Sequence, residues 1–101
     1  MGVLEIDLQR DIEDFLDKNK IYHFRPISGS SSAGQPDVIA CYKGRFVGLE
    51  VKVPKKGTAQ GHQKAIRKLI QQSGGIDEFV RSVDEVKRIL KKIDMDVEWE
   101  R

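Results

Sequence analysis

The sequence contains a single cysteine, Cys41, in 101 residues. One thiol excludes an internal disulfide bond and the paired cysteines of a zinc site. Because Cys41 lies in the apolar run VIACY, we expect it to be a small residue buried in the core.

Long apolar segments are also missing, since no stretch approaches the roughly 18 consecutive apolar residues of a membrane span. The first residues, MGVLEIDLQRD, carry acids where a signal peptide carries bases. A composition of 39% hydrophobic and 34% charged residues excludes a wholly disordered chain. With 101 residues there is room for only one core. We therefore expect a soluble cytoplasmic protein with one domain, residues 1–101, and no membrane partner.

Acidic residues are absent between Glu50 and Asp77, although the net charge of the whole chain is only +2. This stretch contains six bases: Lys52, Lys55, Lys56, Lys64, Arg67 and Lys68. Locally concentrated positive charge predicts a surface that faces phosphate groups. A solvated run of charges is the alternative explanation.

Periodicity and turn signals predict the elements in the order α-β-β-β-α-β-α, an α/β fold with a mixed sheet flanked by helices. Asn19 is suited to the left-handed conformation that ends a helix. The sequence Ser82-Val83-Asp84-Glu85 has the pattern of a capping box. The predicted helices span residues 3–18, 58–72 and 83–93, and the predicted strands span residues 21–25, 38–42, 46–52 and 76–80. Residues 95–101 alternate between apolar and charged, which is typical either of a terminal strand or of a frayed tail.

A tight turn at Lys43-Gly44 is expected to join the two central strands into a hairpin. Glu50 and Lys52 then lie on one face of the sheet because side chains alternate along a strand. A solvent-facing sheet edge also explains this pattern. Counting outward from the turn places Asp37 opposite Glu50.

Two carboxylates that face each other are destabilising unless positive charge lies between them. Mg²⁺ or Mn²⁺ prefers carboxylate, carbonyl and water oxygens, and it also binds substrate phosphate. Lys52 beside these acids is suited to stabilising negative charge on a phosphorus centre. An ordinary ion pair between Lys52 and Glu50 is the alternative.

The sequence contains GQPD at residues 34–37, EVK at residues 50–52, Gln63 on the following helix, and Glu5 with Gln9 on the first helix. Together these motifs resemble the virus-type replication-repair nuclease (VRR-NUC) domain. VRR-NUC domains belong to the PD-(D/E)xK nuclease superfamily and are similar to archaeal Holliday-junction resolvases. The resemblance extends over almost the whole chain and implies a restriction-endonuclease-like fold.

The resemblance also implies roles for individual residues. Asp37, Glu50 and the main-chain carbonyl of Val51 would bind Mg²⁺ or Mn²⁺, Glu5 would complete the acidic cluster, and Lys52 would be the catalytic lysine. Gln63 would be a polar residue of the active site. It shares a helix face with apolar residues, which supports an inward orientation. An acid in the first helical turn, such as Glu5, is also favoured by the helix dipole alone.

Nucleic-acid contacts are predicted on two loops and one helix. Ser30, Ser31 and Ser32 lie in a loop near Asp37, where hydroxyl and N–H groups suit a phosphate backbone. Lys55, Lys56 and Lys64 would add nonspecific contacts to phosphates. A flexible connector and a solvated charge run explain the same residues without DNA.

These observations predict a divalent-metal-dependent, structure-selective endonuclease that cuts branched DNA such as four-way junctions. The resemblance further implies a homodimer, to which Val97 and Trp99 would contribute apolar surface. Junction and flap specificity remain open. So do two other functions: a nuclease-like module that binds nucleic acid without hydrolysis, and an adaptor domain whose last helix recruits a partner.

Overall fold

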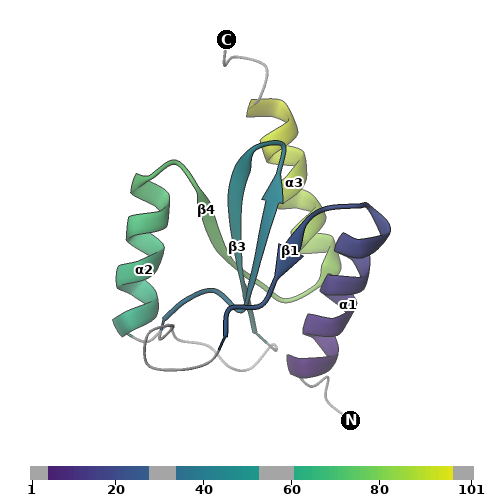
Figure 1. The fold of residues 1–101 in the computed structure, drawn as a ribbon, viewed down its shortest axis with the longest axis horizontal. Helices are drawn as coiled ribbons and strands as arrows, with labels where there is room; N and C mark the ends of the chain where they lie inside the picture. The colour runs from purple at the N-terminus through teal and green to yellow at the C-terminus, as the bar shows by residue number, and fades with distance from the viewer. Residues whose placement is uncertain (1–4, 28–33, 53–60, 97–101) are drawn as a thin grey trace.

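Seven elements follow one another in the predicted order α-β-β-β-α-β-α (Figure 1). The computed structural model describes residues 5–27, 34–52 and 61–96. The elements are α1 (Glu5–Lys18), β1 (His23–Phe24), β2 (Val38–Tyr42), β3 (Arg45–Val51), α2 (Gly61–Gln72), β4 (Ile76–Val80) and α3 (Val83–Asp96).

The four strands form one mixed sheet in the order β1-β2-β3-β4. Neighbouring strands are antiparallel from β1 to β3, whereas β3 and β4 are parallel. A parallel pair needs a crossover connection, and α2 lies in the connection between β3 and β4. The predicted mixed α/β sheet is therefore confirmed.

Helices α1 and α3 lie together on one side of the sheet and α2 lies on the other (Figure 1). Alternation along β3 points Val47, Leu49 and Val51 toward α1 and α3. The buried core contains Leu8, Ile12 and Leu16 from α1, Val47, Leu49 and Val51 from β3, and Val86, Leu90 and Ile93 from α3. The opposite face of β3 carries Gly48 and Glu50, and it is the face on which the candidate site lies.

The prediction that Cys41 is buried is wrong, because this thiol is exposed. Its neighbours Ala40 and Tyr42 point toward α1 and α3, so Cys41 points to the α2 side. Helix α2 packs against β4 and does not extend over this part of β2. An apolar run in a strand predicts alternation but not whether a helix covers each face.

Some boundaries also differ from those predicted. Strand β1 has two residues instead of the predicted residues 21–25, because the N–H of Ile21 is donated to the Leu16 carbonyl at the end of α1 (2.9 Å). Lys20, not Asn19, takes the left-handed conformation, with φ 58°, while the Asn19 side chain donates to the Phe15 carbonyl (2.8 Å). The left-handed residue after α1 is therefore one position later in the chain than predicted.

The capping box predicted at the start of α3 is present in part, because the Glu85 side chain accepts the N–H of the residue before Ser82 instead of the N–H of Ser82 itself. Ser82 Oγ accepts the N–H of Glu85 (3.2 Å), and Glu85 Oε1 accepts the N–H of Arg81. Helix α3 continues to Asp96, so the terminal strand predicted from Met95 does not begin there. Val97 and Trp99, with the rest of the predicted strand, lie outside the described residues.

No helix within the described ranges has both the length and the apolar character needed to cross a membrane.

Candidate active site

The β2–β3 hairpin has the predicted two-residue turn. Lys43 and Gly44 both have positive φ angles, 51° and 81°, as a type I′ turn requires. Tyr42 pairs with Arg45, and the pairing continues to Val38 with Leu49. The next position outward places Asp37 opposite Glu50, as the sequence predicts.

Asp37 is fixed to β3 through both its main chain and its side chain. Its N–H donates to the Leu49 carbonyl (3.1 Å), and its Oδ2 accepts the N–H of Val51 (2.8 Å). Burial raises the pKa of the Asp37 carboxyl, and the charge of Glu5 raises it further, whereas the Val51 N–H and Lys52 lower it. The carboxylate is thus held rigidly at the start of β2.

Pro36 explains why Asp37 approaches β3 so closely. Its side chain is fully buried and packs on Gly48, where an added Cβ would lie only 2.6 Å from Pro36 Cγ. Gly48 therefore leaves the space that Pro36 fills, and the proline in turn fixes the main chain that leads into Asp37.

Glu50 lies inside the protein, with 1% of its surface exposed. The Gln63 side chain donates to Glu50 Oε1 at 3.4 Å, whereas Glu50 Oε2 has no hydrogen-bond donor among the described residues. Burial, the nearby Asp77 and the charge of Asp37 raise the pKa of Glu50 to about 8. Because Glu50 is buried, a solvent-facing sheet edge does not explain the alternating pattern at this position.

Asp77 is a site residue that the sequence analysis missed. It lies on β4, it is completely buried, and its carboxyl is within hydrogen-bonding reach of Glu50. Burial raises the pKa of Asp77 as well. Its strand, IDEFV, contains two neighbouring acids, and the sequence does not show which of them is buried. Only the pairing of β4 with β3 brings Asp77 beside Glu50.

Lys52 follows β3 directly, and its N–H donates to the Val80 carbonyl (3.0 Å). Its Nζ lies over the Phe79 ring, 5.9 Å from the ring centre, and the Arg67 guanidinium lies over the same ring at 4.8 Å. The positive charge of Lys52 lowers the pKa values of both Asp37 and Glu50. Lys52 is therefore close enough to act on the two carboxyls electrostatically.

Glu5 lies in the first turn of α1 and is exposed, yet its charge affects Asp37. Across residues 5–27, 34–52 and 61–96, no three Asp, Glu, His or Cys side chains form a group that could hold a metal ion. Glu50 Oε2 is buried and has no hydrogen-bond partner among the described residues. A carboxylate oxygen of this kind fits a divalent cation, which prefers oxygen ligands.

The predicted nucleic-acid contacts are only partly within the described residues. Lys64 is exposed on α2, the helix that also supplies Gln63 to the site. Ser30, Ser31, Ser32, Lys55 and Lys56 lie outside the described residues.

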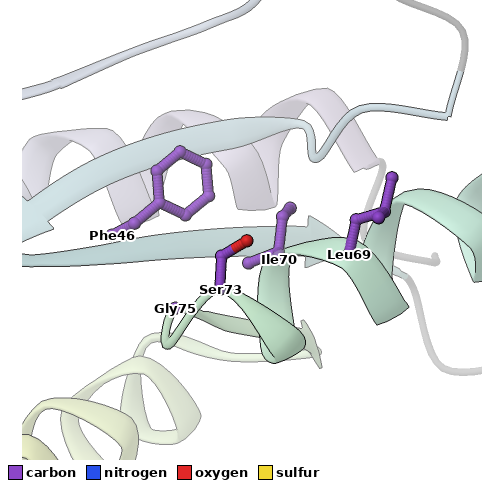
Figure 2. A pocket seen from close by; sticks show the side chains of 5 residues that line it. All are labelled: Phe46, Leu69, Ile70, Ser73 and Gly75. Carbon is purple, nitrogen blue, oxygen red and sulfur yellow. The ribbon is translucent and has the colours of Figure 1, made fainter.

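An apolar pocket of about 300 Å³ opens between the end of α2 and the start of β3 (Figure 2). Its lining consists of Phe46, Leu69, Ile70, Ser73 and Gly75. None of these side chains is ionisable, so the pocket has no group for acid-base or metal chemistry. It belongs instead to the uncovered apolar face of the sheet that also includes Cys41.

Two comparisons with known proteins found a similar family or structure, and a third found no match. The family model described as archaeal Holliday junction resolvase (Hjc) matches residues 6–97. Among solved structures, a VRR_NUC domain protein has a similar fold, with a TM-score of 0.71 and 18% sequence identity. The match covers 90% of this chain and 88% of the other. No curated protein matches the sequence.

Proposed function

Because this chain belongs to the archaeal Holliday junction resolvase family and is therefore a nuclease, we propose that it is a divalent-metal-dependent endonuclease for branched DNA. The observation that carries this proposal is the pair of acids at the hairpin. Asp37 is held on β3 by the Val51 N–H (2.8 Å), and the buried Glu50 beside it has an oxygen with no donor among the described residues.

In this proposal Asp37, Glu50 and the main-chain carbonyl of Val51 hold Mg²⁺ or Mn²⁺, and Glu5 completes the acidic group. A bound divalent cation supplies Lewis acidity, which stabilises charge on a phosphate and promotes ionisation of water. Lys52 stabilises the negative charge that develops on the phosphorus centre during attack. Gln63 holds Glu50 Oε1 through its amide.

DNA is proposed to lie beside the start of α2, at the other end of this helix from the apolar pocket. Lys64 is exposed there, next to Gln63 in the sequence. Ser30, Ser31, Ser32, Lys55 and Lys56 are proposed to add contacts to the phosphate backbone, so that affinity falls as salt rises. Branched DNA arises during replication and repair, and we place the enzyme in these processes in the cytoplasm.

A homodimer is proposed to use the uncovered apolar face of the sheet. Four large side chains on this face are substantially exposed: Tyr22 (70%), Phe24 (45%), Phe46 (40%) and Leu69 (59%). Apolar surface of this extent on a small chain marks an interaction site. A two-fold pairing of copies covers it with the same face and sets two active sites in the symmetry of a four-way junction.

Sedimentation velocity tests the dimer with two matched substitutions. Phe46→Asp adds a charge within the apolar face and is expected to give monomers. Ile6→Asp adds the same charge at a residue of similar exposure, 44%, on α1, and it is expected to leave the dimer intact. A wild type that sediments as a monomer at micromolar concentration contradicts the proposed dimer.

The nuclease proposal is tested by cleavage of labelled four-way junction, flap and linear duplex DNA with Mg²⁺ or Mn²⁺. The wild type is expected to cut branched DNA, and the rates of Asp37→Ala and Lys52→Ala are expected to fall at least about 100-fold. The preferred substrate distinguishes a junction resolvase from a flap nuclease. Junction binding without cleavage by the wild type contradicts the proposal and favours a binding module with a nuclease-like fold.

A further inference from the structure

The outward face of α3 carries positive charge that the chemistry above does not use. The helix packs its apolar side chains into the core, and the residues on its opposite face are exposed. Three of them are bases, which we call the α3 surface: Arg88, Lys91 and Lys92. Lys87 precedes them but lies toward α1, where its Nζ is over the Phe15 ring, 5.6 Å from the ring centre.

The electrostatics of the helix itself do not account for the α3 surface. The helix dipole favours bases in the last turn, but the last turn of α3 has none. Arg88 and Lys92 are four positions apart, so they are neighbours on the helix and repel each other. Asp94, the next acid along the helix, is bound elsewhere, by Lys43 (2.7 Å) and the Tyr42 hydroxyl (3.0 Å). Like charges gathered in this way suit an anionic partner.

A groove of about 390 Å³ extends the α3 surface to the free edge of β4, the last strand of the sheet. Its lining includes three bases, Arg45, Arg81 and Lys92, and two acids, Glu78 and Glu85. Both acids already have partners. Glu78 pairs with a guanidinium of α2 (3.2 Å), and Glu85 accepts the main-chain N–H of Arg81 (2.6 Å). The groove therefore adds bases beside Lys92.

The neighbouring helix α1 has the opposite charge on its outward side. It lies next to α3 on the same side of the sheet (Figure 1), and four of its exposed residues are acids: Asp7, Asp11, Asp14 and Asp17. These acids repel an anionic ligand that the α3 surface attracts. Such a ligand is thereby directed along α3 and the β4 edge, away from α1.

The position of the α3 surface relative to the active site limits which DNA can reach both. Helix α3 lies on one side of the sheet and α2 on the other (Figure 1), and the DNA at the active site is proposed to lie beside the start of α2. One straight duplex follows one side of so small a protein. Two arms that diverge from a branch can follow two sides.

We propose that the α3 surface, with the groove beside it, binds the phosphate backbone of a second arm of branched DNA while the first arm lies at the active site. The inference rests on the proposed function, since it names the feature by which the enzyme recognises branched DNA. Contacts from Lys and Arg to phosphates carry no sequence information, which suits recognition of shape. The proposed dimer uses the apolar face on the other side of the sheet and leaves the α3 surface open.

The salt dependence of DNA binding in EDTA tests the proposal in the absence of cleavage. Each lost contact between a base and a phosphate lowers the slope of log Kd against log salt by about one. For a four-way junction, the triple variant Arg88→Gln, Lys91→Gln, Lys92→Gln is expected to lower this slope by about two to three, measured by fluorescence anisotropy. For a linear duplex, which has no second arm, a decrease of less than about one is expected.

The matched control is the triple variant Arg10→Gln, Lys18→Gln, Lys20→Gln. It also removes one arginine and two lysines, all exposed and located on or just after α1. Net charge changes equally in the two variants, so a general effect of charge would lower both slopes. The control is expected to keep the wild-type slope, because the acids of α1 keep DNA away.

Two results overturn the proposal. A wild-type junction slope in the α3 variant leaves this surface to another partner, such as the acidic α1 of a second copy. Equal decreases for junction and duplex mean that the α3 surface contacts the same arm as the active site. Either result leaves the proposed function standing if the wild type cuts junctions with Mg²⁺. Binding with the expected slopes but without any cleavage overturns the proposed function instead.

Discussion

The site depends on charged side chains that have few neighbours able to neutralise them. Glu50 and Asp77 are both buried, and among the described residues Glu50 Oε2 and both side-chain oxygens of Asp77 have no hydrogen-bond partner. Lys52 is the base that lowers the pKa of Glu50, and it is held over an aromatic ring instead of in contact with an acid. Burial raises the pKa values of both carboxyls, and a bound metal ion would favour their ionised forms.

Phe79 gives the first prediction, because its ring lies beneath both Lys52 (5.9 Å) and Arg67 (4.8 Å). Phe79→Leu removes the ring and with it the cation–π interaction that holds Lys52. Loss of about 1 kcal/mol is expected to slow single-turnover cleavage roughly fivefold. Phe79→Tyr keeps the ring and is expected to retain the wild-type rate.

Phe15→Leu is the control. The Phe15 ring, on α1, lies under a different lysine, Lys87 of α3, at 5.6 Å from the ring centre. Equal rates for Phe79→Leu and the wild type mean that the ring does not position Lys52.

At the scale of elements, the close packing of the GQPD segment on β3 predicts the effect of Gly48→Ala. The added Cβ meets the rigid Pro36 ring at 2.6 Å, so the segment must shift and move Asp37. We expect a loss of about 1 to 3 kcal/mol in the free energy of unfolding, measured by urea denaturation, together with slower cleavage.

Gly44→Asn is the comparison for Gly48→Ala. Gly44 has nothing within 4 Å of an added Cβ and a φ of 81°, which asparagine tolerates. A Gly48→Ala protein as stable as the wild type contradicts the packing argument.

The capping box of α3 gives a prediction about stability alone. Ser82→Ala removes the acceptor for the Glu85 N–H and is expected to lower the free energy of unfolding by about 1 kcal/mol. Ser82→Asp restores an acceptor and should recover most of that loss in the same denaturation experiment. The cleavage rate should not change, because α3 lies on the far side of the sheet from the site.

Element order and the hairpin register were predictable from the sequence because both depend on local signals. The Lys43-Gly44 turn fixes the register of β2 and β3, and so the approach of Asp37 to Glu50. The contact of Asp77 with Glu50 was not predictable in this way, since it depends on the parallel pairing of β3 with β4 across α2. Exposure of Cys41 was missed for a similar reason, because it depends on where α2 lies.

At the scale of the whole molecule, the buried acids predict how stability without metal depends on pH. Burial and Asp77 raise the pKa of Glu50 from 4.5 to about 8. A carboxyl with a raised pKa binds its proton more tightly in the folded state, so its stabilising effect is full below pH 4.5 and is lost as pH rises through 8. The other charged groups around the pair of Glu50 and Asp77 are Asp37, Lys52, Arg67 and Glu78.

In EDTA, we therefore expect the free energy of unfolding to fall by roughly 1 to 3 kcal/mol between pH 5 and pH 8.5. Asp77→Asn removes one of the acids and should make this decline smaller, whereas Glu78→Gln should leave it unchanged. Urea denaturation across this pH range measures the effect. Stability that rises with pH over the same interval contradicts the protonation of the buried pair.

Metal binding by Asp37 and Glu50 is the basis of the proposed cleavage of branched DNA. We would test it first by the single-turnover rate of four-way junction cleavage as Mg²⁺ is added to EDTA-treated protein, for the wild type and Glu50→Gln. We expect no cleavage before Mg²⁺ is added, saturating recovery in the wild type, and a rate at least about 100-fold lower in Glu50→Gln. Cleavage that persists in EDTA, or a Glu50→Gln protein that recovers the wild-type rate, would contradict it.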